Sequence, residues 1–479
     1  MTKITNGLVL AGFDTIISSF KKIVSDRFKN NEKFLNNKII NEMRPGLISF
    51  GTGMIKKSLI SNGDKLYESN FKIIDDSYKY CNKNPFWIDS GGFIFSIGKV
   101  EQSYVSNLIE YYTKYIRETC LNSEYSNMLY FYLDIVPTAG ITKDFSLKHM
   151  KIFHDMLLNK IKDISGAKEK MYIVIQVNNP IAYDTFYHFI RDNSIHEQLN
   201  SHKWSIGGIV PLQNNNPQYI VRPYMPAIFD CLDLELNSLK NNIPVYFHIL
   251  GTSSYYEMFL VAWMNILCEY YNISFIITFD STACINNATR TGTIHYIDKN
   301  NDNNVIKLDS KHANINTRVD NNYTNYDYLN KIKKFLFDNI DIIEDFDWFE
   351  KGRWSKIGSN ALILYEAWAF GKVFDYIKNE CYKKKDWIIY SKNRYNLKSL
   401  VVNIMQKIDN GFNSSVSRKT FDSHIMGRLI KSLEWFELAL KNKLPNENKS
   451  YYLINKMFNT NTHLMTNGIQ KIENIDDFI

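Results

Sequence analysis

The segment FWIDSGGFIFSIG, residues 86–98, joins an apolar strand pattern to a polar, glycine-rich end. Its aromatic and β-branched residues 86–88 favour a buried strand. An ionisable residue, Asp89, follows directly, and Gly91 and Gly92 come two and three residues later. Because Asp, Ser and Gly also favour turns, this segment alone fits both a simple turn and a functional strand end. The pattern of the surrounding chain separates the two interpretations.

From about residue 45 to 282, short apolar runs alternate with amphipathic stretches. Besides Phe86–Asp89, strands are expected at Gly46–Phe50, Met128–Val136, Tyr172–Val177, Ser205–Val210, Pro244–Leu250 and Phe275–Phe279. The helix-like stretches between them include Val105–Thr119, Leu147–Ile164, Ile181–Leu199 and Tyr255–Tyr271. Nearly continuous apolar strands separated by helices indicate βαβ units and a parallel sheet. Seven such strands favour an α/β fold of the (β/α)8 TIM barrel type over an open doubly wound sheet.

The rest of the chain predicts additions to this barrel. Residues 292–323 contain two short β-like runs around an Asn/Asp-rich turn, which indicates a β-hairpin insertion. Beyond Asn325 the chain is mostly helical, with apolar residues at helical spacing in 359–379 and 398–441. The predicted organisation is an N-terminal helical extension (1–44), a barrel with insertions (45–380) and a C-terminal helical region (381–479).

Composition limits the classes of protein that fit. The chain has 479 residues, and a hydrophobic content of 45% is ample for a folded core. The net charge of +7 is compatible with a nucleic-acid partner without requiring one. The start is polar rather than a secretory signal, and the most apolar helix-like run, Met258–Leu267, is short for a membrane span. We expect no membrane partner and a cytoplasmic location, in the host cytoplasm if the protein is viral.

The six cysteines are scattered, with no two within three residues of each other. This spacing excludes a CxxC zinc or redox motif and gives no disulfide framework. Most of these cysteines are expected to be reduced thiols in the core.

Polar or glycine residues end six of the seven expected strands. In chain order these strand ends are Asp89, Asp134, Gln176, Gly207–Gly208, His248 and Asp280. In a barrel, catalytic groups come from the carboxyl ends of the strands, so the six positions would converge on one cavity. Each residue taken singly also fits a turn, a cap or a satisfied buried hydrogen bond. The ordered set favours a functional site.

These residue types suit chemistry at a glycosidic carbon. Two carboxylates can perform a retaining displacement, in which one attacks C1′ and the other transfers the proton. A third carboxylate with an amide can read guanine, whose N1–H and exocyclic amine are hydrogen-bond donors. Paired glycines let the backbone approach a planar ligand closely, and Phe93 is placed to stack on its face.

On these residues the sequence resembles the tRNA-guanine transglycosylases and their DNA-acting relatives. The resemblance spans roughly residues 45–295, and its most specific parts are Asp89-Ser90-Gly91-Gly92-Phe93, Phe279-Asp280 and Arg290-Thr291-Gly292. Weaker matches are Leu133-Asp134 with Pro137, Gln176, Ile206-Gly207-Gly208 and Gly251-Thr252. The resemblance implies a (β/α)8 barrel that exchanges guanine in a polynucleotide for a 7-deazaguanine.

The resemblance also implies roles for single residues. Asp280 matches the nucleophile and Asp89 the general acid/base. The base-binding set is Ser90, Phe93, Asp134, Gln176, Gly207, Gly208 and His248, where Phe93 stacks on the base. For His248 a satisfied strand-end histidine is an equal alternative. Arg290, Lys56 and Lys57 would bind phosphates, although each one singly also fits ordinary surface charge.

One departure from the family is large. The tRNA enzymes hold a structural zinc through a Cys-x-Cys-x-x-Cys cluster and a His after the barrel, whereas this chain has only Cys381 beyond Cys284. We therefore expect no metal and no cofactor, with packing by the aromatic segment Tyr323–Lys356 in place of zinc. The missing zinc site and the AT-rich, virus-like composition favour phage-type DNA modification over tRNA as substrate.

The expected function is thus a DNA-guanine transglycosylase, a pentosyltransferase that inserts 7-cyano-7-deazaguanine or a close precursor. The alternatives are a tRNA-guanine transglycosylase without zinc, a non-catalytic nucleic-acid-binding partner subunit, or another barrel enzyme such as a glycosidase. A glycosidase leaves the glycine pair with Asp134 and Gln176 unexplained, and an inactive subunit leaves the retention of Asp89 and Asp280 unexplained. The oligomeric state is open at this stage.

Overall fold

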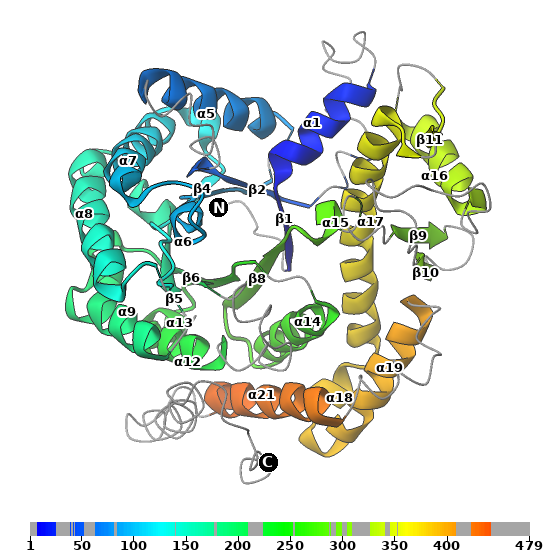
Figure 1. The fold of residues 1–479 in the computed structure, drawn as a ribbon. Helices are drawn as coiled ribbons and strands as arrows, with labels where there is room; N and C mark the ends of the chain where they lie inside the picture. Colours follow the sequence, from blue (N-terminus) through cyan, green and yellow to red (C-terminus); the bar gives the residue numbers. More distant parts are fainter. Residues whose placement is uncertain are drawn as a thin grey trace.

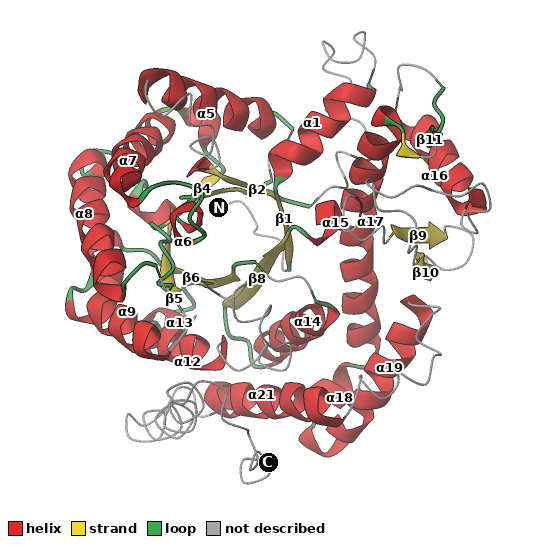
Figure 2. Ribbon diagram, in the orientation of Figure 1, coloured by secondary structure: helices red, strands yellow, loops and turns green. Residues whose placement is uncertain are grey.

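The computed structural model describes residues 7–24, 39, 42, 44–51, 63–80, 84–138, 140–176, 180–208, 224–251, 254–286, 288, 294–298, 304–308, 326–340, 345–351, 353–408 and 423–441. Eight parallel strands close into a barrel, which confirms the (β/α)8 prediction (Figures 1 and 2). They pair in chain order: β1 (Leu8–Ala11), β2 (Gly46–Ser49), β3 (Phe86–Asp89), β4 (Met128–Phe131), β5 (Met171–Gln176), β6 (Lys203–Gly207), β7 (Val245–Ile249) and β8 (Phe275–Ser281).

The seven strands expected from the sequence are all present, and β4 is shorter than expected. The apolar run to Val136 suggested a longer strand, but β4 ends at Phe131. Tyr132 still donates its backbone N–H to the carbonyl of Tyr172, at 2.9 Å, and no β-ladder pairing is formed beyond it. The residues that follow, including Asp134, therefore belong to the loop at the carboxyl end of the strand.

The eighth strand corrects the predicted N-terminal boundary. Residues 1–44 were expected to form a helical extension outside the barrel, but Leu8–Ala11 form β1, which pairs with both β2 and β8. Only after this strand does the chain enter helix α1 (Phe13–Ile23). All four residues of β1 are buried. A four-residue apolar run carries too little periodicity to be distinguished from the start of a helix, so its pairing partners decide its structure.

Helices follow the strands and surround the barrel (Figure 1). Between α1 and β8 the described residues form α5 (Gly63–Tyr78), α6 (Phe93–Ser96), α7 (Val105–Leu121), α8 (Lys143–Ile161), α9 (Pro180–Asp192), α10 (Ile195–Leu199), α12 (Tyr224–Leu234), α13 (Leu236–Lys240) and α14 (Tyr255–Tyr270). The start of α14 is fixed by a capping box, in which the Ser254 backbone N–H donates to Glu257 at 2.7 Å.

After β8 and the short helix α15 (Ala283–Asn286), the chain adds helical material on one side of the barrel. These helices are α16 (Tyr326–Asn339), α17 (Lys356–Lys383), α18 (Lys385–Ile389), α19 (Leu397–Ile408) and α21 (Ser423–Lys441). The long helix α17 packs against α1 and α14 and is drawn in yellow beside the barrel in Figure 1. It begins where Ser355 Oγ accepts the backbone N–H of Gly358 at 2.9 Å. This agrees with the helical pattern predicted for 359–379.

The expected hairpin insertion is also present. Strands β9 (Ile294–Asp298) and β10 (Asn304–Leu308) pair antiparallel. Buried hydrogen bonds join the hairpin to α17: the carboxylate of Glu366 accepts the backbone N–H of His295 at 2.9 Å and lies 2.6 Å from its Nδ1. On the outer side of His295, Nε2 lies 2.6 Å from the hydroxyl of Tyr255.

The segment expected to replace a zinc site by aromatic packing contains α16 and the short antiparallel pair β11 (Phe349–Glu350) and β12 (Arg353–Trp354). The ring of Phe335 on α16 lies 4.6 Å, centroid to centroid, from the ring of Trp368 on α17. Near the pair, Trp348 and Trp354 meet edge to face at 5.9 Å. Aromatic contacts thus join this segment to α17.

Across the described residues, no helix combines the length and apolar character that a membrane crossing requires.

Candidate active site

The carboxyl ends of β3, β4, β5, β6, β7 and β8 meet at one mouth of the barrel, as parallel strands require. Asp89 ends β3, Gln176 ends β5 and Gly207 ends β6. Asp280 is the sixth residue of the seven-residue strand β8. The candidate residues therefore lie on neighbouring strands of one closed sheet, as the sequence analysis expected.

Asp89 is held by the turn that follows it. Its Oδ2 accepts the backbone N–H of Gly91 at 3.2 Å. Gly91 has a φ of 79°, and a Cβ there would lie 2.4 Å from the Cα of Gly51, so only glycine fits. Asp89 is half-buried as a residue, but its Oδ1 is completely buried and accepts no hydrogen bond among the described residues.

This environment raises the pKa of Asp89 to about 7. Burial is the largest cause, and the negative charges of Asp134 and Asp280 act in the same direction. The Ser49 hydroxyl and the Gly91 N–H oppose the shift only in part. Ser49 pairs with Asp89 in the register of β2 and β3. A carboxyl group with this pKa can both donate and accept a proton near neutral pH, as a general acid/base must.

Asp134 and Gln176 form a polar pair against the end of β6. The Gln176 amide Nε2 donates to Asp134 Oδ1, and Gln176 Oε1 is completely buried with no hydrogen-bond partner in the described part of the chain. A Cβ at Gly207 would lie 2.8 Å from Asp134 Oδ1 and 3.1 Å from Gln176 Nε2, so the missing side chain leaves room for this pair. Burial raises the pKa of Asp134 to about 6, aided by Asp280 and opposed by the Gln176 amide.

Ser90 has a structural place in the site. Its Oγ accepts the backbone N–H of Gly92 at 3.3 Å and that of Asp134 at 3.0 Å. The side chain thereby joins the turn after β3 to the loop after β4. Ser90 has no exposed surface, so it positions the carboxylates rather than offering its hydroxyl to a base.

Asp280 is anchored through one of its two carboxylate oxygens. Its Oδ1 accepts the backbone N–H of Gly251 at 2.8 Å and lies 3.2 Å from His248 Nε2. Among the described residues, Oδ2 has no hydrogen-bond partner. Hydrogen bonds therefore fix one oxygen of a nearly buried carboxylate, whose side chain is 6% exposed.

His248 differs from the expected base contact. Its side chain has no exposed surface, and Nδ1 lies 2.8 Å from Thr278 Oγ1. Its ring lies among the aromatic rings of Trp87, Phe131 and Tyr172, with centroid separations of 6.1, 5.1 and 6.2 Å. Both ring nitrogens have partners within the barrel and aromatic rings pack around the imidazole, so the assignment of His248 to base binding is corrected. The histidine is satisfied within the barrel, and one of its two partners is Asp280.

Phe93 and Gly208 lie where the sequence analysis placed them. Phe93 is the first residue of α6, directly after the turn that holds Asp89, and its side chain is half-buried. Gly208 follows β6 and is also half-buried. The three cationic residues expected to bind phosphates, Lys56, Lys57 and Arg290, lie outside the described residues.

Two side chains of this site, Ser49 and Thr278, were not predicted, and Gly251 was matched to the family without a role. Ser49 stands opposite Asp89, Thr278 stands opposite His248 in the pairing of β7 and β8, and Gly251 supplies a backbone N–H to Asp280. Thr278 lies two residues before Asp280, so both side chains are on the same face of β8. The two-residue spacing between Thr278 and Asp280 was the feature of the sequence that could have identified Thr278. Ser49, and the contact that Gly251 makes, can be recognised only once the strands are paired.

Metal ligands are not gathered in the described part of the chain: no group of three or more His, Cys, Asp or Glu residues there is arranged to hold a metal ion. Of the cysteines in these residues, Cys231, Cys268, Cys284 and Cys381 are buried free thiols and Cys120 is half-buried. The expectation of a zinc-free protein stays a prediction.

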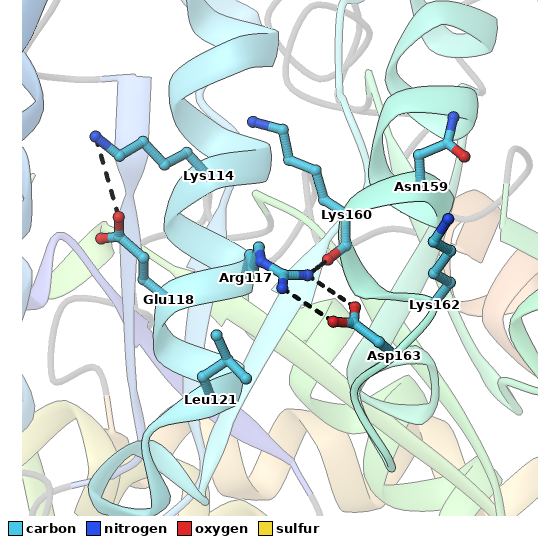
Figure 3. Close-up of a pocket in the computed structure, with 8 residues that line it drawn as sticks. All are labelled: Lys114, Arg117, Glu118, Leu121, Asn159, Lys160, Lys162 and Asp163. Carbon is cyan, nitrogen blue, oxygen red and sulfur yellow. Dashed lines mark hydrogen bonds and ion pairs between the residues drawn. The ribbon is translucent and has the colours of Figure 1, made fainter.

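A surface hollow of about 460 Å³ lies between α7 and α8 (Figure 3). Its residues come from the carboxyl-terminal halves of the two helices and the two residues after α8: Lys114, Arg117, Glu118, Leu121, Asn159, Lys160, Lys162 and Asp163. Arg117 donates to both carboxylate oxygens of Asp163, at 2.8 and 3.0 Å. Barrel helices run antiparallel to the strands, so these helix ends lie at the opposite end from Asp89 and Asp280.

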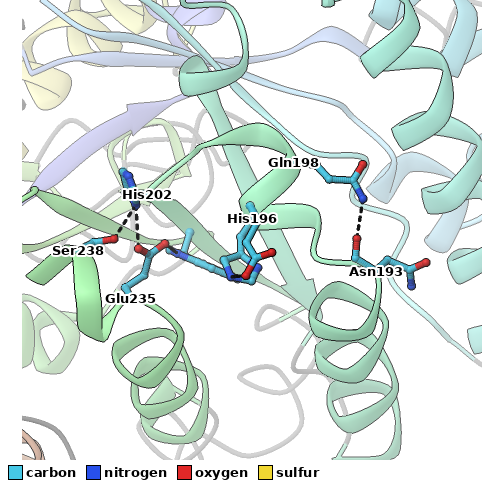
Figure 4. Close-up of polar contacts among 8 residues, drawn as sticks. Asn193, His196, Gln198, His202, Glu235 and Ser238 are labelled. Atoms are coloured by element: carbon cyan, nitrogen blue, oxygen red, sulfur yellow. Dashed lines mark hydrogen bonds and ion pairs between the residues drawn. The ribbon is translucent and has the colours of Figure 1, made fainter.

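A second polar cluster lies where β6 begins (Figure 4). His202 Nδ1 is 2.8 Å from Glu235 Oε2, and the indole N–H of Trp204 donates to Glu235 Oε1 at 2.8 Å. Ser238 Oγ lies 3.2 Å from the same His202 nitrogen. These contacts join the start of β6 to the end of α12 and to α13, away from the candidate site.

No model of a known protein family matches the chain, and no curated protein matches it.

Proposed function

We propose that the chain is a DNA-guanine transglycosylase that exchanges guanine in DNA for a 7-deazaguanine base through a covalent glycosyl-aspartate. The proposal rests on one observation: the two carboxylates at the same mouth of the barrel differ in their hydrogen bonding and in their pKa. Asp280 has its Oδ1 held by hydrogen bonds, and among the described residues no hydrogen bond holds its Oδ2. Asp89 has its pKa raised to about 7. One carboxylate is thus suited to attack and the other to proton transfer.

In the first half-reaction the target guanosine enters the mouth as a flipped or single-stranded nucleotide. Asp280 Oδ2 attacks C1′, the bond between C1′ and N9 breaks, and its electron pair leaves with guanine. Asp89 in its protonated form gives a proton to the departing base. In the second half-reaction Asp89 takes the N9 proton of the incoming 7-deazaguanine. N9 then attacks C1′ and displaces Asp280, which restores the enzyme without any redox change.

The base-reading part of the proposal rests on Asp134 and Gln176. The carboxylate of Asp134 can accept from N1–H and the exocyclic amine of guanine, and the Gln176 amide offers donor hydrogens. The two side chains contact each other directly, which places them side by side at the end of β6. The half-buried ring of Phe93 would cover the face of the base.

DNA is proposed over tRNA because the sequence lacks the zinc-binding cysteines of the tRNA enzymes. The substrate is tested by incubating the full chain with radiolabelled guanine and duplex DNA, single-stranded DNA or tRNA. Label in DNA supports the proposal, and label in tRNA alone favours the tRNA enzyme. No label in any polymer favours the non-catalytic subunit.

Asp280→Asn tests the mechanism in the same assay. The variant should lose label uptake and should form no protein–DNA adduct that survives denaturation, because the amide is a poor nucleophile. Asp163→Asn is the matched control, since Asp163 is a surface carboxylate paired with Arg117. Full exchange by Asp280→Asn would remove Asp280 from the role of nucleophile.

A further inference from the structure

The buried side chain of His248 forms a hydrogen bond with Asp280, and this bond bears on the proposed reaction. A carboxylate carries only hydrogen-bond acceptors, so the contact of 3.2 Å requires the hydrogen on His248 Nε2. On the other side of the ring, Thr278 Oγ1 lies 2.8 Å from Nδ1. A hydroxyl can donate or accept, so Thr278 is compatible with a ring that keeps its hydrogen on Nε2.

We propose that His248 is a positioning residue that holds Oδ1 of Asp280 and thereby selects Oδ2 as the oxygen that attacks C1′. This inference rests on the proposed transglycosylase function. His248 does not touch the substrate, because its side chain has no exposed surface. It acts through Asp280, together with the N–H of Gly251, which contacts the same oxygen at 2.8 Å.

The surroundings make this arrangement rigid. Three aromatic rings enclose the imidazole, the closest being Phe131 at 5.1 Å between centroids. Ser205 Oγ also donates to the backbone carbonyl of His248 at 3.0 Å. A group packed in this way has little rotational freedom, so the carboxylate that it contacts keeps one orientation. Preorganised orientation of a nucleophile lowers the barrier because no rotamer search precedes the attack.

Two amide substitutions separate positioning from a general structural role. The Nε2 of a glutamine reaches about as far from Cα as the Nε2 of histidine, whereas an asparagine amide reaches only as far as Nδ1. His248→Gln can therefore still donate to Asp280, while His248→Asn can contact only Thr278. Both substitutions introduce one buried amide. If His248 only packed in the core, the two variants would therefore lose activity to a similar extent. His248→Phe keeps a planar ring and removes both nitrogens.

The first measurement is the single-turnover rate of the denaturation-resistant protein–DNA adduct, with KM for guanine measured alongside. A misplacement of about 1 Å costs about 100-fold in rate, so we expect His248→Phe and His248→Asn to be about 10- to 100-fold slower with little change in KM. His248→Gln should stay within about 5-fold of the parent, and so should the control His202→Gln at the distant histidine–carboxylate pair. Equal rates for the Gln and Asn variants, or a parent-like rate for His248→Phe, would overturn the proposal.

A second measurement does not depend on catalysis. ¹⁵N-histidine NMR of the full chain, with the His248 signal assigned by its loss in His248→Gln, reports which ring nitrogen carries hydrogen. The proposal expects hydrogen on Nε2, and a ring with hydrogen on Nδ1 alone would overturn it. If the parent protein forms no adduct but His248 carries hydrogen on Nε2, the proposed function fails while the contact with Asp280 stands.

Discussion

Replacing Gly207 by alanine places one methyl group against the pair proposed to read guanine. Gly207 is the last residue of β6 and pairs with Gln176 in the adjacent strand. The added Cβ would lie 2.8 Å from Asp134 Oδ1, whereas ordinary contacts of this kind begin at 3.4 Å. The carboxylate must therefore retreat by about 0.6 Å. The Gln176 amide, at 3.1 Å from the same position, also has to give way.

The expected loss follows from this displacement. A misplacement of about 1 Å costs about 100-fold, so a shift of about 0.6 Å should lower kcat/KM for guanine exchange about 10- to 100-fold. This corresponds to about 1.4 to 2.7 kcal/mol of transition-state stabilisation. The barrel should stay folded, because alanine is at least as favourable as glycine within a strand.

The assay is uptake of labelled guanine into DNA, with binding of free guanine measured by calorimetry and folding checked by thermal melting. Gly140→Ala is the matched control, since a Cβ at Gly140 would meet no atom within 4 Å. The control should bind and exchange guanine like the parent. If Gly207→Ala also binds and exchanges guanine normally while melting normally, guanine is not read by Asp134 and Gln176, and the proposed orientation of the base is wrong.

Three further predictions concern the pKa of Asp89, the anchoring of the hairpin and the metal content. Because the pKa of Asp89 is raised from 3.8 to about 7, the native state keeps a proton that the unfolded chain has lost, so this group makes stability fall as pH rises from about 4 to about 7. The melting temperature of Asp89→Asn should therefore be higher than that of the unsubstituted protein at pH 8 and close to it at pH 4. An equal difference in melting temperature at both pH values would contradict the raised pKa of Asp89. Glu366→Ala leaves the backbone N–H and Nδ1 of buried His295 without their acceptor and should lower the free energy of unfolding in urea by about 2–6 kcal/mol, whereas an unchanged value would show that these hydrogen bonds do not anchor the hairpin. Elemental analysis should find no stoichiometric zinc and a chelator should leave exchange unchanged; one zinc per chain would refute this.

Most of the barrel could be predicted from the sequence because its strands are nearly continuous apolar runs buried on both faces. The strand Phe86–Asp89 has the same limits in the structure as in the prediction. The strand Leu8–Ala11 could not be found in this way. It is only four residues long, and its place depends on pairing with β2 and β8, which are distant in the chain.

The candidate site was predictable as a set of residues but not as a set of contacts. Asp89, Gln176 and Asp280 were recognisable because polar residues interrupt apolar strands at their carboxyl ends. The role of His248 was not, because the sequence does not show that the ring is enclosed by aromatic residues of β3, β4 and β5. Contacts between strands depend on register, and register is a property of the closed sheet.

The pairing of β1 with β8 has a consequence for how the protein is made. Leu8 lies opposite Phe279, so the barrel cannot close until about 270 further residues have been synthesised. At about 5–20 residues per second, the first strand waits on the order of 10 to 50 s for its second neighbour. During that time one edge of an apolar strand is open to other chains. A nascent chain stalled before β8 should therefore aggregate or recruit chaperones, whereas one that has passed Ser281 can close its sheet.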